Sequence, residues 1–276
     1  ELFKDFLPDP RDYDKVLKEL GIEVAAGDEY DENKKKKSLT LESLYSLVEQ
    51  IMSETDEQYY FNFSFFKIDP KWRWMADLAK EESAKEVENI LKNSGIKYRA
   101  YSNLGLRDDA DFLLWFVGSS LEEIQKAIEK LYKTVFGKYI IPSMTYLSCT
   151  RPSIYVKGDK KEHGFITGME PKKHVIVYPF TKTREWYLLP QEKRQEIMDE
   201  HIEVSKKYPQ VILNTTYSFG IHDEDFMLAF EVDNVRDFQD LIMDLRETQV
   251  STYVKNDIPM IVCIKKDIVP LISSLG

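Results

Sequence analysis

The segment YSNLGLRDDADFLLW at residues 101–115 returns later in the chain as YSFGIHDEDFML at residues 217–228. Both copies read Tyr-Ser, then a glycine, a run of acidic residues, and an Asp-Phe pair that opens an apolar run. Self-similarity at such a long spacing indicates two copies of one supersecondary unit. The rest of the chain is therefore interpreted as two successive repeats.

The elements expected around each copy follow one order, which is strand, helix, strand, strand, helix, strand. Apolar periodicity, helix caps and turn residues place the elements of the first repeat at 59–68, 70–93, 96–103, 111–117, 121–135 and 139–149. The same signals place those of the second repeat at 175–180, 190–207, 211–219, 226–232, 235–248 and 259–264, with a short helix at 267–275. This order is the ferredoxin-like β-α-β-β-α-β unit.

Each sheet would have one face covered by its two helices. The other face, which carries Phe61, Phe63 and Phe65 in the first repeat, still needs cover. Two sheets packed against each other provide that cover. The sequence thus predicts an α+β protein of two tandem ferredoxin-like units, at residues 46–158 and 159–276, whose sheets form a sandwich or barrel-like core.

A polar N-terminal arm is expected over residues 1–45. Its stretch GDEYDENKKKK, residues 27–37, has the composition of a solvated linker, and an amphipathic helix is expected at 41–54. No role for the arm follows from its residues, although a subunit contact is one interpretation.

Composition and charge argue against several classes of protein. The net charge of −10 argues against nucleic acid as the main partner, because binding phosphates needs a basic surface. Cys149 and Cys263 are the only cysteines, which favours a reducing compartment and predicts a cytoplasmic protein. No apolar run approaches the roughly 18–20 residues of a membrane-spanning helix, so no span is expected.

His201 is a candidate ligand, because it lies on the predicted helix 190–207 and shares its inward face with Ile197 and Val204. A neutral imidazole can bind iron through one nitrogen while the other needs an acceptor. The alternative is an ordinary hydrogen-bonded core histidine.

Three residues upstream of that helix suit a planar, anionic, redox-active ligand: Tyr178, Lys182 and Trp186. Each also has a plainer interpretation, as a sheet tyrosine, a solvated lysine and a core tryptophan. The residues alone leave these alternatives open.

Several ordered blocks resemble the chlorite dismutase-like superfamily, which includes the coproheme decarboxylases. The matching blocks, besides residues 101–115, are NFSFFKIDPKWR (62–73), MTYLSCTRPSIYV (144–156), YPFTKTREWYLLP (178–190), EH (200–201) and NTTYSFG (214–220). The resemblance runs from about Tyr59 to Lys265. It implies that the C-terminal unit binds haem b or iron coproporphyrin III, and that the chain assembles as a homopentamer.

The resemblance also implies roles for the four candidates of the second repeat. His201 matches the axial ligand of the iron, and Tyr178 matches the tyrosine that carries a radical near a propionate in the decarboxylases. Lys182 matches the lysine that holds a propionate, and Trp186 matches an aromatic residue beside the porphyrin.

Three further positions distinguish branches of the family. Leu213 stands where chlorite-degrading members place a distal arginine, which argues against chlorite lysis because an apolar side chain cannot hold the anion. His163 lies in the loop from which the actinobacterial decarboxylases take a distal histidine. Gln249 replaces the carboxylate that accepts a hydrogen bond from the axial histidine.

The sequence therefore predicts an oxidoreductase that decarboxylates iron coproporphyrin III with hydrogen peroxide to make haem b. The alternative is a haem carrier, sensor or weak peroxidase that keeps His201 without decarboxylase turnover. A chlorite O₂-lyase is the third hypothesis, and Leu213 counts against it.

Overall fold

The first repeat forms a four-stranded antiparallel sheet with the strand order β4-β1-β3-β2. The strands are β1 (Tyr60–Ile68), β2 (Lys97–Ser102), β3 (Phe112–Gly118) and β4 (Ile140–Cys149). Its helical elements are η1 (Pro70–Trp74), α3 (Asp77–Lys92), α4 (Leu121–Lys133) and η2 (Phe136–Lys138). We describe them from a computed structural model, in which residues 58–153, 155 and 164–276 are described. The expected arm at 1–45, the helix at 41–54 and His163 lie outside these residues.

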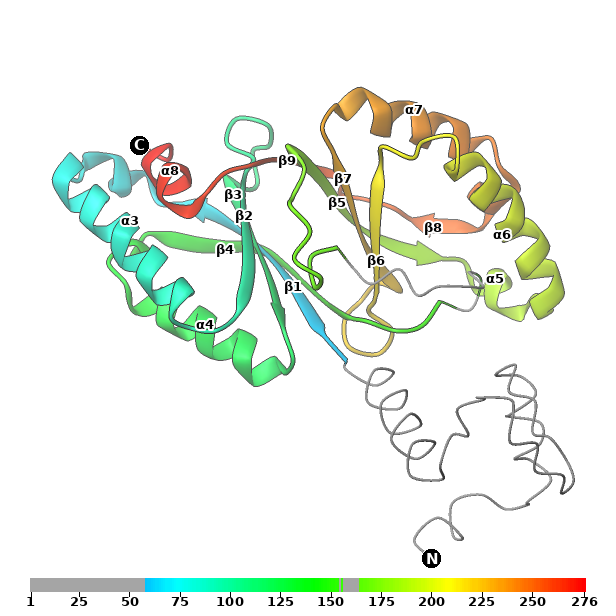
Figure 1. The fold of residues 1–276 in the computed structure, drawn as a ribbon, viewed down its shortest axis with the longest axis horizontal. Helices are drawn as coiled ribbons and strands as arrows, with labels where there is room; N and C mark the ends of the chain where they lie inside the picture. The colour runs from blue at the N-terminus through cyan, green and yellow to red at the C-terminus, as the bar shows by residue number, and fades with distance from the viewer. Residues whose placement is uncertain (1–57, 154, 156–163) are drawn as a thin grey trace, which may run out of the picture. The chain divides into compact units, whose positions relative to one another are not determined.

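The second repeat has the same strand order, β9-β5-β7-β6. Its strands are β5 (His174–Lys182), β6 (Ile212–Tyr217), β7 (Phe226–Val232) and β9 (Ile261–Lys265), and a short strand that the sequence did not predict, β8 (Val254–Asn256), pairs with β5. Its helical elements are α5 (Arg184–Leu188), α6 (Gln191–Ser205), α7 (Val235–Arg246) and η3 (Gln249–Tyr253). The terminal helix α8 (Ile268–Ser273) packs beside α3 of the first repeat (Figure 1). No helix among the described residues is long and apolar enough to cross a membrane.

The two sheets are joined edge to edge, and eight strands close into a ring. β2 pairs with β9 at one seam, β4 pairs with β6 at the other, and pairing of β5 with β7 completes the circle. This agrees with the predicted barrel-like core and shows that the eight strands of the ring leave no sheet edge open. The ring interior is lined by apolar side chains of both repeats, including Phe61, Trp115 and Val177.

A buried ion pair crosses the ring between the repeats. Arg99 Nη1 on β2 lies 2.8 Å from Glu231 Oε1 on β7, and both side chains are almost fully buried. Asn214 donates a further hydrogen bond of 3.1 Å to the same carboxylate oxygen. Because a buried charge without its partner is costly, this pair ties the halves into one folding unit.

The repeats superpose with a constant spacing of 114 residues over most of their length, as from the Phe66–Phe112 pair to the Phe180–Phe226 pair. The two Tyr-Ser pairs in which the repeat was recognised, at 101–102 and 217–218, do not occupy the same structural positions but are shifted by one residue. The main-chain N–H groups of Asn103 and Ser218 donate to the carbonyls of Asp111 and Asp225, at 3.0 and 2.9 Å. Ser218 therefore occupies the position of Asn103, because the second hairpin loop is one residue shorter.

The single helix expected at 70–93 needs correction, because the first repeat breaks it into η1 and α3. The helix expected at 190–207 is confirmed as α6, but the sequence did not predict the short helix α5 that precedes it. In the first repeat, Met75 and Ala76 are extended between η1 and α3. In the second, Leu189 and Pro190 are extended between α5 and α6, and the proline disfavours a helical conformation of the residue before it. The break lets the short first piece turn one tryptophan of each repeat, Trp72 or Trp186, into the core.

Candidate functional site

The candidate residues lie on the helix-covered face of the second sheet. Side chains alternate along a strand, so Ile176, Tyr178 and Phe180 of β5 share this face. The strand register places Leu228 of β7 beside Tyr178, and Thr215 of β6 beside Leu228. These rows make a mostly apolar floor beneath α6 and α7.

Lys182 ends β5 and brings a buried cation to this face. Only 7% of the residue is exposed, and Nζ has no hydrogen-bond partner among the described residues. Nζ lies 3.8 Å from the centre of the Trp186 ring, a distance at which a cation is attracted to the ring. Burial lowers the Lys182 pKa to about 8, and the Asp225 carboxylate opposes that shift.

His201 lies on α6 near this cation. Burial, and to a lesser extent the Lys182 charge, lower the pKa of the imidazole to about 4, and the Glu200 charge opposes the shift. The ring is therefore neutral at pH 7, as a metal ligand must be. Its Nδ1 is buried and has no hydrogen-bond partner in the described part of the chain.

Trp186 connects these two residues to the helices. It is 1% exposed and packs against Ile197 of α6 and Val250 of η3. Tyr253 and Tyr155 contribute rings at 5.4 and 6.1 Å from the Trp186 ring. The structure thus places Lys182 over Trp186, and it places His201 on the helix whose Ile197 packs against the same tryptophan.

Tyr178 lies on the same sheet face but packs in a neighbouring cluster. Its ring stacks on Phe230 with a centroid distance of 5.9 Å and an interplanar angle of 5°, and Phe238 of α7 lies 6.4 Å away. Burial raises the pKa of the phenol, so the hydroxyl stays protonated at neutral pH.

Leu213 lies on β6 and Gln249 begins η3. Leu213 is 47% exposed on β6 and is paired in register with Phe230. Gln249 is exposed on η3, and its main-chain N–H donates to Glu200 Oε2 at 3.0 Å. The expected hydrogen bond between Gln249 and His201 is not present, since Nδ1 has no partner among the residues described. Glu200 reaches the chain at Gln249 instead of the imidazole.

Sequence reasoning missed two residues of this region. Asp225 Oδ2 accepts hydrogen bonds from the main-chain N–H of Lys182 at 2.8 Å and from the phenol of Tyr187 at 2.7 Å. The repeated Asp-Phe pair marked Asp225 as structural, and Tyr187 carried no signal beyond its place after Trp186.

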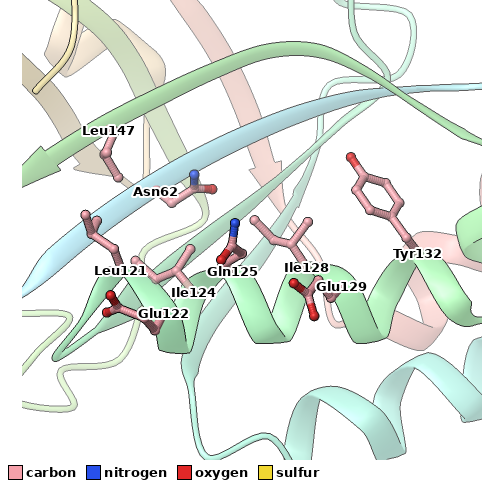
Figure 2. Close-up of a pocket in the computed structure, with 9 residues that line it drawn as sticks. All are labelled: Asn62, Leu121, Glu122, Ile124, Gln125, Ile128, Glu129, Tyr132 and Leu147. Atoms are coloured by element: carbon pink, nitrogen blue, oxygen red, sulfur yellow. The ribbon is translucent and has the colours of Figure 1, made fainter.

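The same positions in the first repeat hold no such chemistry. At the spacing of 114 residues seen from Phe66 to Phe180, the counterparts of Tyr178, Lys182, Trp186 and His201 are Ser64, Ile68, Trp72 and Val87. The cavity of about 500 Å³ in the first repeat (Figure 2) instead lies between α4 and strands β1 and β4. Its lining includes Asn62, Ile128 and Tyr132 but no histidine or lysine, so it is separate from the candidate site.

The residues of the second repeat fit an iron porphyrin. No three His, Cys, Asp or Glu side chains gather to hold a metal ion in the part of the chain that the structure describes. A metal at His201 would therefore need other ligands, and a porphyrin supplies four nitrogens. The buried, unpartnered Nζ of Lys182 suits a carboxylate of the porphyrin, and the apolar floor suits its ring.

Comparisons with known proteins agree with this geometry. The sequence model of the chlorite dismutase family matches residues 80–266. The coproheme decarboxylase of Mycolicibacterium smegmatis is 31% identical over 209 residues, which cover 72% of this chain and 87% of that protein.

Two solved structures show the same fold. The chlorite dismutase of Candidatus Nitrospira defluvii in complex with imidazole has a TM-score of 0.72 and 22% identity, and the match covers 83% of this chain and 98% of that one. A variant of that enzyme in complex with cyanide also has a TM-score of 0.72 and 22% identity, over 82% and 98% of the two chains. Fold, matched sequence and relatives together show that this chain belongs to the chlorite dismutase family.

Proposed function

We propose that the second repeat binds iron coproporphyrin III and that the chain decarboxylates it with hydrogen peroxide to form haem b. The observation that carries the proposal is the buried Nζ of Lys182, which has no described hydrogen-bond partner and lies over the Trp186 ring, with the neutral imidazole of His201 on α6 close enough to feel its charge. An unsatisfied buried ammonium is expensive in a protein interior unless a ligand uses it. The 31% identity with a coproheme decarboxylase supports the choice of ligand.

Each candidate residue has a role in this proposal. His201, kept neutral by burial and by the Lys182 charge, is the residue that would hold the iron. Lys182 binds a propionate as a point charge at the end of β5, and Trp186 holds the lysine and walls the porphyrin. Leu213 gives the rim an apolar surface, and His163 is the candidate for acid–base assistance to peroxide.

The overall reaction balances for each propionate side chain. R–CH₂CH₂–COOH and H₂O₂ give R–CH=CH₂, CO₂ and two molecules of water. The bound iron supplies the activation of peroxide. Peroxide supplies two oxidising equivalents. One takes an electron and a proton from Tyr178, which its buried surroundings keep protonated, and the resulting phenoxyl takes a hydrogen atom from the propionate β-carbon. The other takes an electron from the carbon radical left behind, as CO₂ leaves and the vinyl group forms.

One experiment tests the reaction. The purified protein is loaded with iron coproporphyrin III, titrated with peroxide, and the porphyrin is analysed by mass spectrometry. We expect the stepwise loss of two molecules of CO₂, which Tyr178→Phe abolishes. Bleaching of the porphyrin without loss of CO₂ would contradict the decarboxylase.

A haem carrier or sensor is the second candidate. It is favoured by two observations, namely His201 Nδ1 without a carboxylate partner among the described residues and Tyr178 packed between phenylalanine rings. A histidine that donates to no carboxylate pushes less electron density to iron, which weakens peroxide activation. Tight binding of haem b with no turnover would select this function, whereas oxygen release from chlorite would select the third hypothesis and overturn the argument from Leu213.

We extend the proposal to the organisation of the protein. The units at 46–158 and 159–276 are the two repeats, and the chain functions as a cytoplasmic homopentamer. Light scattering on the purified protein tests the assembly, and a monomer would contradict it.

A further inference from the structure

Asp225 is the carboxylate whose charge acts on the Lys182 ammonium, yet no hydrogen bond joins the two side chains. Asp225 Oδ2 instead accepts from the main-chain N–H of Lys182 and from the Tyr187 phenol. Lys182 Nζ has no hydrogen-bond partner in the described chain and rests over the Trp186 ring. The charge of Asp225 acts on the Lys182 ammonium, but the carboxylate makes its described hydrogen bonds with the main chain and the phenol.

The first repeat shows which part of this arrangement is only architecture. Asp111 Oδ2 accepts from the main-chain N–H of Ile68 at 2.8 Å, as Asp225 does from Lys182. The position that corresponds to Tyr187 in the first repeat is occupied by Arg73, and the neighbour that corresponds to Lys182 is apolar. A carboxylate that accepts from the main chain, Asp111 or Asp225, is therefore common to both repeats. The Tyr187 phenol occurs only in the second repeat, where the Lys182 cation is also present.

We propose that Tyr187 is a positioning residue that keeps Lys182 free for an anionic ligand by occupying the Asp225 carboxylate. This rests on the proposed function, since the anion would be a porphyrin carboxylate. The phenol satisfies Asp225 and fixes its orientation toward β5 and α5. Without the phenol, the Asp225 carboxylate would be left to pair with the Lys182 ammonium, on which its charge already acts, and that ion pair would withdraw Nζ from Trp186 and from the ligand.

The proposal predicts a particular pattern of affinities for iron coproporphyrin III, measured by absorbance titration. Tyr187→Phe weakens binding by about tenfold or more, the range expected for loss of one charge-assisted contact. The double variant Tyr187→Phe/Asp225→Asn restores the affinity, because it removes the competing anion. In a Lys182→Met background, Tyr187→Phe has no further effect.

Two controls separate this role from structural damage. The tetramethyl ester of the same porphyrin, which has no carboxylates, should bind Tyr187→Phe and the unaltered protein equally. Asp111→Asn removes the matching carboxylate of the first repeat and should leave porphyrin affinity unchanged. Weaker binding of the ester by Tyr187→Phe, or no restoration by Asp225→Asn, would overturn the proposal.

A crystal structure of porphyrin-free Tyr187→Phe tests the inference independently of the proposed function. We expect Lys182 Nζ within about 4 Å of an Asp225 oxygen, the usual limit of an ion pair. A lysine that still rests over Trp186 would refute the role of Tyr187. Failure of the unaltered protein to bind iron coproporphyrin III would instead refute the proposed ligand and leave this structural test standing.

Discussion

The two halves of the molecule share one backbone plan but fill the space between sheet and helices differently. In the first half, α3 buries Ser83, Ala84, Val87 and Leu91, and α8 adds further apolar side chains to the same cluster. In the second half, α6 buries only Ile197 of its own residues. The helix α3 is thus anchored to the first sheet by several buried side chains, whereas α6, which carries His201, is anchored by one.

The difference teaches that a few side chains on a duplicated frame separate a structural half from a functional one. Trp72 and Trp186 are equally buried, so the tryptophan belongs to the shared plan. The replacement of Ile68 by Lys182 and of Val87 by His201 adds polar atoms that no described side chain satisfies. Unsatisfied buried groups cost stability, and a ligand that uses them recovers it.

Giving the second half the residue of the first should have the largest effect on function. His201→Val removes the proposed axial ligand, so the absorbance change on adding iron porphyrin should disappear. The variant should remain folded, because the first half accepts valine at the matching position with no exposure. A spectrum identical to that of the unaltered protein would remove His201 as the ligand.

The reverse exchange should have the largest effect on stability. Val87→His places a larger polar side chain in a filled apolar cluster, which should cost about 2–5 kcal/mol in the free energy of unfolding. Denaturant titration measures this, with Val87→Ile as a size control. An unchanged free energy of unfolding in Val87→His would mean that the cluster around Val87 can accommodate a larger polar side chain.

The pH dependence of stability should differ between the unaltered protein and His201→Val. The unfolded chain takes up a proton at His201 below about pH 6.5, whereas the folded chain does so only below about 4. The free energy of unfolding should therefore fall as the pH is lowered from about 6.5 to 4, by at most about 3 kcal/mol. That component should be missing in His201→Val, and equal curves for both proteins would contradict the lowered pKa.

Replacing Lys182 by the isoleucine of the first half should stabilise the porphyrin-free protein. Lys182→Ile removes a buried cation with no described hydrogen bond, and a gain of about 1–3 kcal/mol is expected. The same variant should bind iron coproporphyrin III more weakly and its methyl ester unchanged. A loss of stability would show that the ammonium has a partner that the described residues do not include.

A pair of matched glutamates should respond equally, because there the halves are alike. Glu86 accepts from the N–H of Val135 and Glu200 from that of Gln249, both at 3.0 Å. Glu86→Gln and Glu200→Gln should each cost about 0.5–1 kcal/mol, since the amide oxygen can still accept. A much larger loss of unfolding free energy in Glu200→Gln than in Glu86→Gln would show that Glu200 has a role besides the hydrogen bond that both glutamates make.

The sequence predicted the strands well, because aromatic and β-branched runs alternate clearly in both repeats. The predicted helix start at residue 121 was also correct: the Ser120 hydroxyl accepts from the main-chain N–H of Glu123, and the Glu123 carboxylate accepts from the main-chain N–H of Ser119. The break at Met75–Ala76 and the short helix α5 were missed, because burial of a tryptophan, not helix propensity, fixes these short helical pieces. Gln249 as the partner of His201 stays a prediction, because His201 Nδ1 has no hydrogen-bond partner among the described residues and the main-chain N–H of Gln249 donates to Glu200.

The sequence by itself determined the duplication, the order of strands and helices, and the residue types near the site. These are properties of local pattern, which a repeat displays twice. Only the tertiary structure decided that the sheets close into a ring, that Lys182 lies over Trp186 while Tyr178 packs apart, and that Tyr187 holds Asp225. Those relations depend on register between distant strands and on which buried polar atoms remain without a partner, and neither quantity is written in any local stretch of residues.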